Sequence, residues 1–125
     1  MKNKTVLITG AAKNIGAVIA EELHSCGMNV IVHYNNSEEA AHELVKKLNT
    51  NRHDSAISIK ADLEKEDHYI PLVNTALNFK GHIDVLINNA SVFYQTSLNN
   101  LNIKQWNELI NINLKAPLFI SQLAA

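Results

Sequence analysis

Short aliphatic runs alternate along this chain with longer segments in which apolar residues recur at helical spacing. The runs cover residues 6–8, 30–32, 56–59 and 85–87. Runs this short and this uniformly apolar are typical of strands that are buried on both faces of a parallel sheet. Strands that alternate with helices favour right-handed βαβ units. The pattern therefore predicts an α/β fold with a doubly wound parallel sheet.

The segments between these runs are predicted to be helices. Three apolar stripes have helical spacing: Ile15, Val18, Ile19, Leu23 and Cys26; Ala41, Leu44, Val45 and Leu48; and Ile70, Val73, Ala76 and Leu77. Gly27 is placed to end the first helix, and Ser37 is placed to cap the second. A last helical segment runs from about residue 103 to the end, with Trp106, Ile110 and Leu114 on one face.

Size and charge limit the partners of the chain. Its 125 residues suffice for one domain with a core. A net charge of -1 with 18% charged residues gives no basic field for nucleic acid or anionic lipid. The first apolar run is too short for a signal peptide, and nothing approaches 18 consecutive apolar residues. We therefore expect a cytoplasmic protein with a small-molecule substrate and neither nucleic-acid nor membrane partners.

Cysteine and histidine give no indication of a metal site. The single cysteine, Cys26, excludes an internal disulfide, and we expect it to be a small buried apolar residue. The six histidines are scattered without the spacing of metal ligands. We expect most of them to lie at the surface and predict no metal.

A glycine-containing loop follows the first predicted strand and leads directly into the first predicted helix. Residues 9–16 read Thr-Gly-Ala-Ala-Lys-Asn-Ile-Gly. Gly10 permits a sharp turn and Gly16 a close approach of helix to strand, so that free N–H groups at the helix start can bind a diphosphate. Two glycines alone would fit a structural turn equally well, but the strand–loop–helix context favours a nucleotide site. Its candidate residues are Gly10, Lys13, Asn14, Ile15 and Gly16.

The chain resembles the short-chain dehydrogenase/reductase family. Besides the loop, in which Asn14 stands where the family commonly has glycine, three stretches carry the resemblance: Ala-Asp-Leu at 61–63, Asp-Val-Leu-Ile-Asn-Asn-Ala-Ser at 84–91, and Asn-Ile-Asn-Leu at 111–114. Within the family, residues 9–13, 33–37 and 89–94 are most similar to pteridine reductases. The resemblance implies that residues 1–125 are the N-terminal part of a single NAD(P)-binding Rossmann-like domain, with an incomplete sheet of strand order 3-2-1-4. It also implies a homo-oligomer, a tetramer for the full-length enzyme.

The end of the second predicted strand bears on the choice of cofactor. An NAD site commonly presents a carboxylate to the ribose about 20 residues after the glycine loop. Here residues 33–37 read His-Tyr-Asn-Asn-Ser, with no acid before Glu38. By the resemblance, Asn36 and Ser37 would hold a 2′-phosphate, with Lys13 adding positive charge, which implies NADPH. The alternative is a polar strand-to-helix loop.

The resemblance assigns further residues to the cofactor. Asp62 would accept a hydrogen bond from the adenine amino group, with Leu63 beside the ring; a turn aspartate is the alternative. The ribose would lie against the residues that follow the fourth strand, Asn89, Ala90 and Ser91. Asn88 is expected to tie neighbouring strands together.

On the substrate side, the resemblance implies that Ser91 contacts both cofactor and substrate and that Phe93 stacks on the pterin. A core phenylalanine is the alternative for Phe93. The resemblance implies a catalytic role for Asn113, whose main-chain carbonyl would hold a water in a proton relay. Pro117 lacks the N–H that would otherwise bond to this carbonyl, so we predict a helix kink that leaves the carbonyl free.

The family's proton donor, a tyrosine with a lysine four residues later, has no counterpart here. The tyrosines at 34, 69 and 94 are followed four residues later by Glu38, Val73 and Leu98. Because a general acid contributes about 10²–10⁴-fold, we expect the 125-residue chain alone to be nearly inactive. The fourth strand should form an exposed apolar edge that favours association with another chain.

These observations lead to one functional prediction with open alternatives. We predict the NADPH-binding part of an oxidoreductase that reduces pterins of the dihydropteridine or dihydrofolate class. The alternatives are a 3-oxoacyl-carrier-protein reductase, a sugar dehydrogenase, a non-catalytic NADP-binding module, and a structural protein in which the loop is vestigial.

Overall fold

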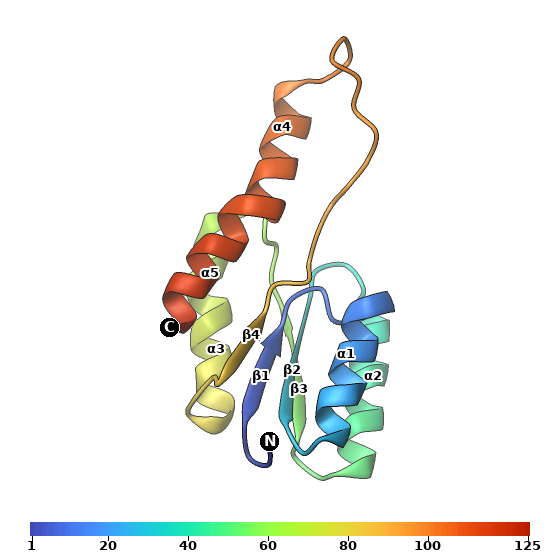
Figure 1. The fold of residues 1–125 in the computed structure, drawn as a ribbon, viewed down its shortest axis with the longest axis vertical. Coiled ribbons are helices and arrows are strands. Elements are labelled where there is room, and N and C mark those ends of the chain that lie inside the picture. Colours follow the sequence, from blue (N-terminus) through green and yellow to red (C-terminus); the bar gives the residue numbers. More distant parts are fainter.

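A four-stranded parallel sheet of order β3-β2-β1-β4 forms the centre of the computed structural model, which describes residues 1–125 (Figure 1). The strands are β1 (Thr5–Ile8), β2 (Asn29–Tyr34), β3 (Ala56–Lys60) and β4 (Val85–Ile87). All three strand pairs are parallel. The predicted fold class, strand positions and strand order are confirmed.

Helices cover both faces of the sheet, as Figure 1 shows. The helices are α1 (Asn14–Ser25), α2 (Glu38–Asn51), α3 (Tyr69–Lys80), α4 (Ile103–Ile110) and α5 (Ala116–Ala124), with a 3-10 turn η1 (Glu66–His68) and a π-helix η2 (Asn111–Lys115). α1 and α2 lie on one face, and α3 and α5 lie on the other. None of the helices combines the length and the apolar character needed to cross a membrane.

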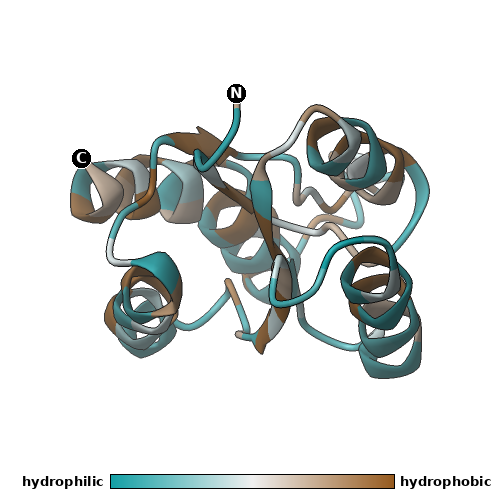
Figure 2. Ribbon diagram, turned by 90° about the horizontal axis from the view of Figure 1, so that it is seen from below, coloured by the Kyte–Doolittle hydropathy of each residue, from teal (hydrophilic) through white to brown (hydrophobic).

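Alternation along the strands divides the core into two layers. Val6 and Ile8 of β1 pack towards α1 and α2. Leu7 of β1 and Ile31 of β2 pack towards α3 and α5 on the opposite face. All four side chains are fully buried, and Figure 2 shows the apolar strands between the surrounding helices. Burial on both faces explains why the strand sequences are continuously apolar.

The packed face of α1 matches its predicted apolar stripe only in part. Ile19 and Leu23 of that stripe pack against the core. Ile15 and Val18 are 71% and 68% exposed, whereas the small residues Gly16 and Ala20 face the sheet together with His24. Small residues let the helix approach the strands closely, so this face is the one that packs. The helix itself and its end before Gly27, which has a φ of 97°, are as predicted.

The expectations for two single residues, Cys26 and Ser37, need correction. Cys26 is exposed because it lies at the C-terminal end of α1 and not on its packed face. The expectation that most histidines lie at the surface holds for four of the six, which are exposed or half-buried, whereas His24 and His33 are buried. Ser37 does occupy the residue before α2, but its side chain makes no capping hydrogen bond.

The β4 edge is open, as predicted. Val85 is 37% exposed and the other two residues of β4 are only half-buried. Apolar residues of the neighbouring α5 are also exposed: Leu118, Phe119 and Leu123.

Candidate functional site

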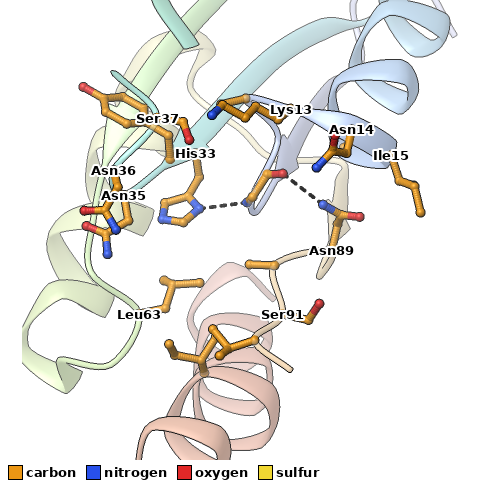
Figure 3. Close-up of a pocket in the computed structure, with 17 residues that line it drawn as sticks. Lys13, Asn14, Ile15, His33, Asn35, Asn36, Ser37, Leu63, Asn89 and Ser91 are labelled. Atoms are coloured by element: carbon orange, nitrogen blue, oxygen red, sulfur yellow. Dashed lines mark hydrogen bonds between the residues drawn. The ribbon is translucent and has the colours of Figure 1, made fainter. Parts of the chain in front are cut away.

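A pocket of about 500 Å³ lies at the carboxyl ends of the strands. It is formed by the loop between β1 and α1, the end of β2, and the loops after β3 and β4 (Figure 3). Eleven predicted cofactor residues line it: Gly10, Lys13, Asn14, Ile15, Gly16, Asn36, Ser37, Leu63, Asn89, Ala90 and Ser91. Three predicted site residues do not: Asp62, Phe93 and Asn113.

The main-chain N–H groups of the glycine loop divide into two sets. The N–H of Gly10 donates to Nδ1 of His33 and that of Ala11 donates to the His33 carbonyl, each over 3.0 Å. The N–H groups of residues 12–16 have no protein acceptor. The amides available to an anion therefore begin at residue 12, and of the predicted loop residues only Gly10 has its N–H already bonded. Free N–H groups at a helix N-terminus attract phosphate.

Close packing explains the glycines of this loop. A Cβ on Gly10, which has a φ of 62°, would lie 2.9 Å from Cα of Ala90. A Cβ on Gly16 would lie 2.7 Å from Nδ2 of Asn89. Asn14, in place of the commoner glycine, has a φ of 54°. Asparagine is among the few residues that tolerate this left-handed conformation, so the replacement preserves the loop.

His33 is a site residue that the sequence analysis missed. Its ring is 2% exposed; Nδ1 accepts the Gly10 N–H at 3.0 Å, and Nε2 donates to the Ala61 carbonyl at 2.8 Å. Burial lowers the pKa of His33, and the bond to Ala61 offsets this only in part. A histidine inside an otherwise apolar strand was the available signal.

Thr9 and Asn89 fix the loop to the end of β4. The side chain of Asn89 donates to the carbonyls of Thr9 and Gly10, at 3.1 and 3.0 Å. Oγ1 of Thr9 accepts the N–H groups of Asn89 and Ala90, at 3.1 and 3.0 Å. Asn88 was predicted to tie neighbouring strands together, but Asn89 is the residue that does so. Asn88 instead donates to Oγ of Ser121 at 3.1 Å.

The loop after β3 is held by its own hydrogen bonds. Oδ1 of Asp62 accepts the Glu64 N–H at 3.0 Å, which makes Asp62 the turn residue named as the alternative. The Asp62 N–H donates to Nδ1 of His68 at 2.9 Å. The Tyr69 hydroxyl donates to the Leu63 carbonyl at 3.0 Å. These bonds place Leu63, but not Asp62, against the pocket.

The pocket lining has one charged side chain, Lys13, and no carboxylate. The nearest acid in sequence, Glu38, accepts a 3.4 Å hydrogen bond from the Tyr34 hydroxyl and does not line the pocket. The end of β2 instead contributes amide and hydroxyl groups from Asn35, Asn36 and Ser37 (Figure 3). This lining favours an anionic ligand.

The segment after β4 leads away from the pocket. Ser91 lines the pocket, but Phe93 is 92% exposed, which removes the core phenylalanine as an explanation and leaves the ring outside the described pocket. The side chain of Asn113 pairs with the main chain of Val92, accepting its N–H at 2.9 Å and donating to its carbonyl at 2.7 Å. Asn113 thus holds the loop that carries Ser91 and Phe93.

The helix around Asn113 widens where a kink was predicted. Residues 111–115 form the π-helix η2, in which the Ala116 N–H donates to the Asn111 carbonyl. Pro117 follows in a helix that continues from η2 into α5, so its missing N–H leaves a carbonyl of the preceding turn without a helical donor. The helix is therefore interrupted by a π-turn at the place where a kink was predicted.

Comparison with known proteins gives relatives over nearly the whole chain. It is 32% identical to 3beta-hydroxysteroid dehydrogenase 1 of Eggerthella lenta over 91% of this chain and 43% of that protein. It is 32% identical to a versicolorin reductase of Emericella nidulans over 98% of this chain and 46% of that protein. The chain spans about half the length of the curated relatives it matches.

Solved structures agree closely with the fold. FolM alternative dihydrofolate reductase 1 from Brucella suis, in complex with NADP, matches 97% of this chain and 50% of its own with a TM-score of 0.91 and 31% identity. A blue fluorescent protein from a metagenomic library, in complex with NADPH, matches 98% and 50% with a TM-score of 0.94 and 30% identity. The short chain dehydrogenase family pattern matches residues 4–125. With this match over nearly its full length, the chain belongs to the short-chain dehydrogenase family.

Proposed function

We propose that this chain binds NADPH in the pocket and forms the cofactor-binding part of a reductase. The observation that carries the proposal is the lining, which combines five N–H groups without protein acceptors, at residues 12–16, with the absence of any carboxylate. Such amides suit a diphosphate, and a lining without carboxylates spares a 2′-phosphate from repulsion. The NADP and NADPH held by the solved relatives support this choice.

The residues of the pocket fit the parts of this cofactor. Residues 12–16 would hold the diphosphate, and Asn36, Ser37 and Lys13 would hold the 2′-phosphate. Leu63 would contact adenine; a role for Asp62 there requires its carboxylate to exchange the Glu64 N–H for the adenine amino group. The ribose would lie against the residues after β4, Asn89, Ala90 and Ser91.

The chemistry divides between cofactor and protein. When bound, the nicotinamide supplies a hydride. The family's Tyr-x-x-x-Lys pair is absent from this sequence, so we expect the chain to bind NADPH with little or no turnover. In a complete site, the main-chain carbonyl of Asn113 would hold a water of the proton relay. Membership of the short-chain dehydrogenase family supports assembly as a homo-oligomer.

For the substrate we propose a pterin of the dihydropteridine or dihydrofolate class, contacted by Ser91 and Phe93. The similarity to a dihydrofolate reductase supports it. A second candidate is a carbonyl substrate, as for a 3-oxoacyl-carrier-protein reductase or sugar dehydrogenase, which the similarity to a hydroxysteroid dehydrogenase supports. Calorimetric titration of the NADPH-saturated chain with a dihydropterin and with an acetoacetyl thioester distinguishes the two.

The cofactor proposal is tested by titrating the chain with NADPH and NADH. We expect NADPH to bind at least about tenfold more tightly, because donors and Lys13 face the 2′-phosphate. The isosteric substitution Asn36→Asp should remove this preference by placing a carboxylate in the lining. Asn74→Asp on the exposed face of α3 adds the same charge outside the pocket and should leave the preference unchanged. Equal binding of NADH by the unmodified chain would contradict the proposal.

A further inference from the structure

We propose that His33 is a positioning residue, whose neutral imidazole, protonated on Nε2, holds the glycine loop in the shape that presents the N–H groups of residues 12–16. The link from loop shape to ligand binding rests on the proposed function. The state of the imidazole itself can be measured without a ligand.

His33 joins the glycine loop to the end of β3. Its ring accepts the Gly10 N–H at 3.0 Å and donates to the Ala61 carbonyl at 2.8 Å (Figure 3 shows the first of these bonds). Its own main-chain carbonyl accepts the Ala11 N–H at 3.0 Å. One buried residue therefore takes up the two N–H groups that immediately precede the free ones. Two of these bonds hold the loop at Gly10 and Ala11, and the third ties the ring to Ala61.

Only one form of the imidazole satisfies both ring contacts. The Gly10 N–H can only donate, so Nδ1 must carry a lone pair, and the Ala61 carbonyl can only accept, so Nε2 must carry the proton. A doubly protonated ring would direct a second N–H at the N–H of Gly10. Burial lowers the pKa of His33, which keeps the required neutral form at a lower pH than in an exposed histidine.

No charged side chain near the ring takes the place of the Gly10 N–H or the Ala61 carbonyl as a hydrogen-bond partner of His33. The titratable groups of the segments around the ring are Lys13 before α1, Glu38 at the start of α2, Lys60 and Asp62 at the end of β3, and His68 in η1. None of them hydrogen-bonds to the imidazole of His33. His68 is the nearest analogue, because its Nδ1 accepts the Asp62 N–H at 2.9 Å. It therefore serves as a matched control.

The sign of the pH effect follows from the lowered pKa. The unfolded chain takes up the proton on His33 near pH 6.5, while the folded chain resists it until a lower pH. The contribution of His33 is complete above about pH 6.5 and declines as the pH falls from there through the folded pKa. Protonation in the folded state breaks the Gly10 bond, so we expect binding at the loop to weaken only as the pH falls through the lowered pKa of folded His33.

The experiment uses ADP-ribose, whose diphosphate does not ionise between about pH 5 and about pH 8, the range in which histidine titrates. The substitution His33→Phe should weaken its binding about tenfold or more at neutral pH, because the Gly10 N–H and the Ala61 carbonyl lose their partner. His33→Asn keeps an acceptor at the place of Nδ1 and cannot titrate. It should retain most of the binding and lose the acidic decline seen in the unmodified chain. His68→Asn should keep that decline.

A ligand-free measurement separates the outcomes. Nitrogen NMR of the imidazole should show a protonated Nε2 and a bare Nδ1 at neutral pH, with slow hydrogen exchange at Gly10. A proton on Nδ1, or unaltered ADP-ribose binding in the folded His33→Phe variant, would overturn the role of His33. The chain could also show the expected imidazole form and yet bind neither NADPH nor ADP-ribose. That result would support the role of His33 in holding the loop and overturn the proposed cofactor function.

Discussion

The two sides of the sheet differ in how completely the chain covers them. On the β1–β2 side, the side chains of Val6, Leu7 and Ile8 are fully buried between helices on both faces. On the β4 side, Val85 is 37% exposed, and β4 has no strand beyond it. The strands that carry the glycine loop are thus packed by the chain's own residues. The part proposed to meet the substrate presents apolar surface suited to further contacts.

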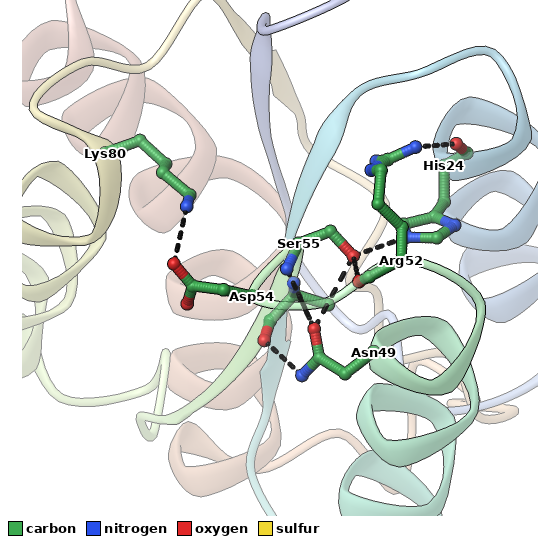
Figure 4. Close-up of polar contacts among 7 residues, drawn as sticks. His24, Asn49, Arg52, Asp54, Ser55 and Lys80 are labelled. Carbon is green, nitrogen blue, oxygen red and sulfur yellow. Dashed lines mark hydrogen bonds and ion pairs between the residues drawn. The ribbon is translucent and has the colours of Figure 1, made fainter.

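Polar contacts also differ between parts of the molecule. Near the start of β3, Asn49 accepts the N–H groups of Ser55 and Ala56, each at 2.9 Å, and Oγ of Ser55 lies 2.7 Å from Nε2 of the buried His24 (Figure 4). The ion pair between Lys115 of η2 and Glu66 of η1 is, in contrast, exposed. Buried, satisfied networks fix an arrangement, whereas exposed ion pairs contribute little.

The largest predicted effect compares two leucines that are register partners. Leu7 of β1 is fully buried and lies beside Leu86 of β4, which is half-buried. Leu7→Ala should lower the free energy of unfolding by about 3–5 kcal/mol, because it leaves a cavity in the core. Leu86→Ala should cost about 1 kcal/mol, because much of its surface is already hydrated. Urea unfolding measures both, and equal costs would show that the β4 side is covered in solution.

A second prediction compares two glycines with positive φ. A Cβ at Gly10 would press on the main chain of Ala90, whereas a Cβ at Gly81 would meet nothing within 4 Å. Gly81→Ala should cost only the left-handed conformation, about 1–2 kcal/mol. Gly10→Ala adds overpacking, for a total of about 2–4 kcal/mol, and should also abolish NADPH binding. Thermal unfolding and calorimetry test this; Gly10→Ala with unaltered binding would contradict the loop geometry.

A third prediction compares adjacent asparagines. Asn89→Ala removes the donors to the Thr9 and Gly10 carbonyls and should cost about 1–3 kcal/mol. Asn88→Ala removes one exposed contact to Ser121 and should change stability by less than about 0.5 kcal/mol. Urea unfolding of the two variants provides the measurement. A larger loss of stability for Asn88→Ala than for Asn89→Ala would show that Asn88, and not Asn89, connects β1 to β4.

The sequence predicted the sheet well because local and global signals agree there. Strands such as β1 are apolar on both faces, and the glycine loop follows a strand and precedes a helix. Hydrophobicity predicted the packed face of α1 only in part. Ile19 and Leu23 pack against the core. Gly16 and Ala20 also face the sheet, while Ile15 is exposed. The distance between the backbones of α1 and the strands decides which residues can pack there, and residue hydrophobicity carries no information about that distance.

The candidate site was predictable wherever chain order alone places residues at the ends of strands. Eleven of the predicted residues line the pocket for this reason. The role of His33 depends on which way its ring points and on two partners distant in sequence, Gly10 and Ala61. The turn bond of Asp62 to the Glu64 N–H likewise depends on local geometry. Such contacts follow from the tertiary structure and not from residue type.

The smallest effect on stability is predicted for the loop after β4. Phe93 and Leu98 are 92% and 91% exposed, so replacing either with alanine should change the free energy of unfolding by less than about 0.5 kcal/mol. The two variants should differ in ligand binding. If Phe93 stacks on a pterin, Phe93→Ala should weaken dihydropterin binding to the NADPH-saturated chain about fivefold, the equivalent of about 1 kcal/mol. Leu98→Ala controls for exposed apolar surface and should leave that binding unchanged. An equal loss in both variants would mean that the loop contributes general apolar contact, and that Phe93 is not a specific platform for the ring.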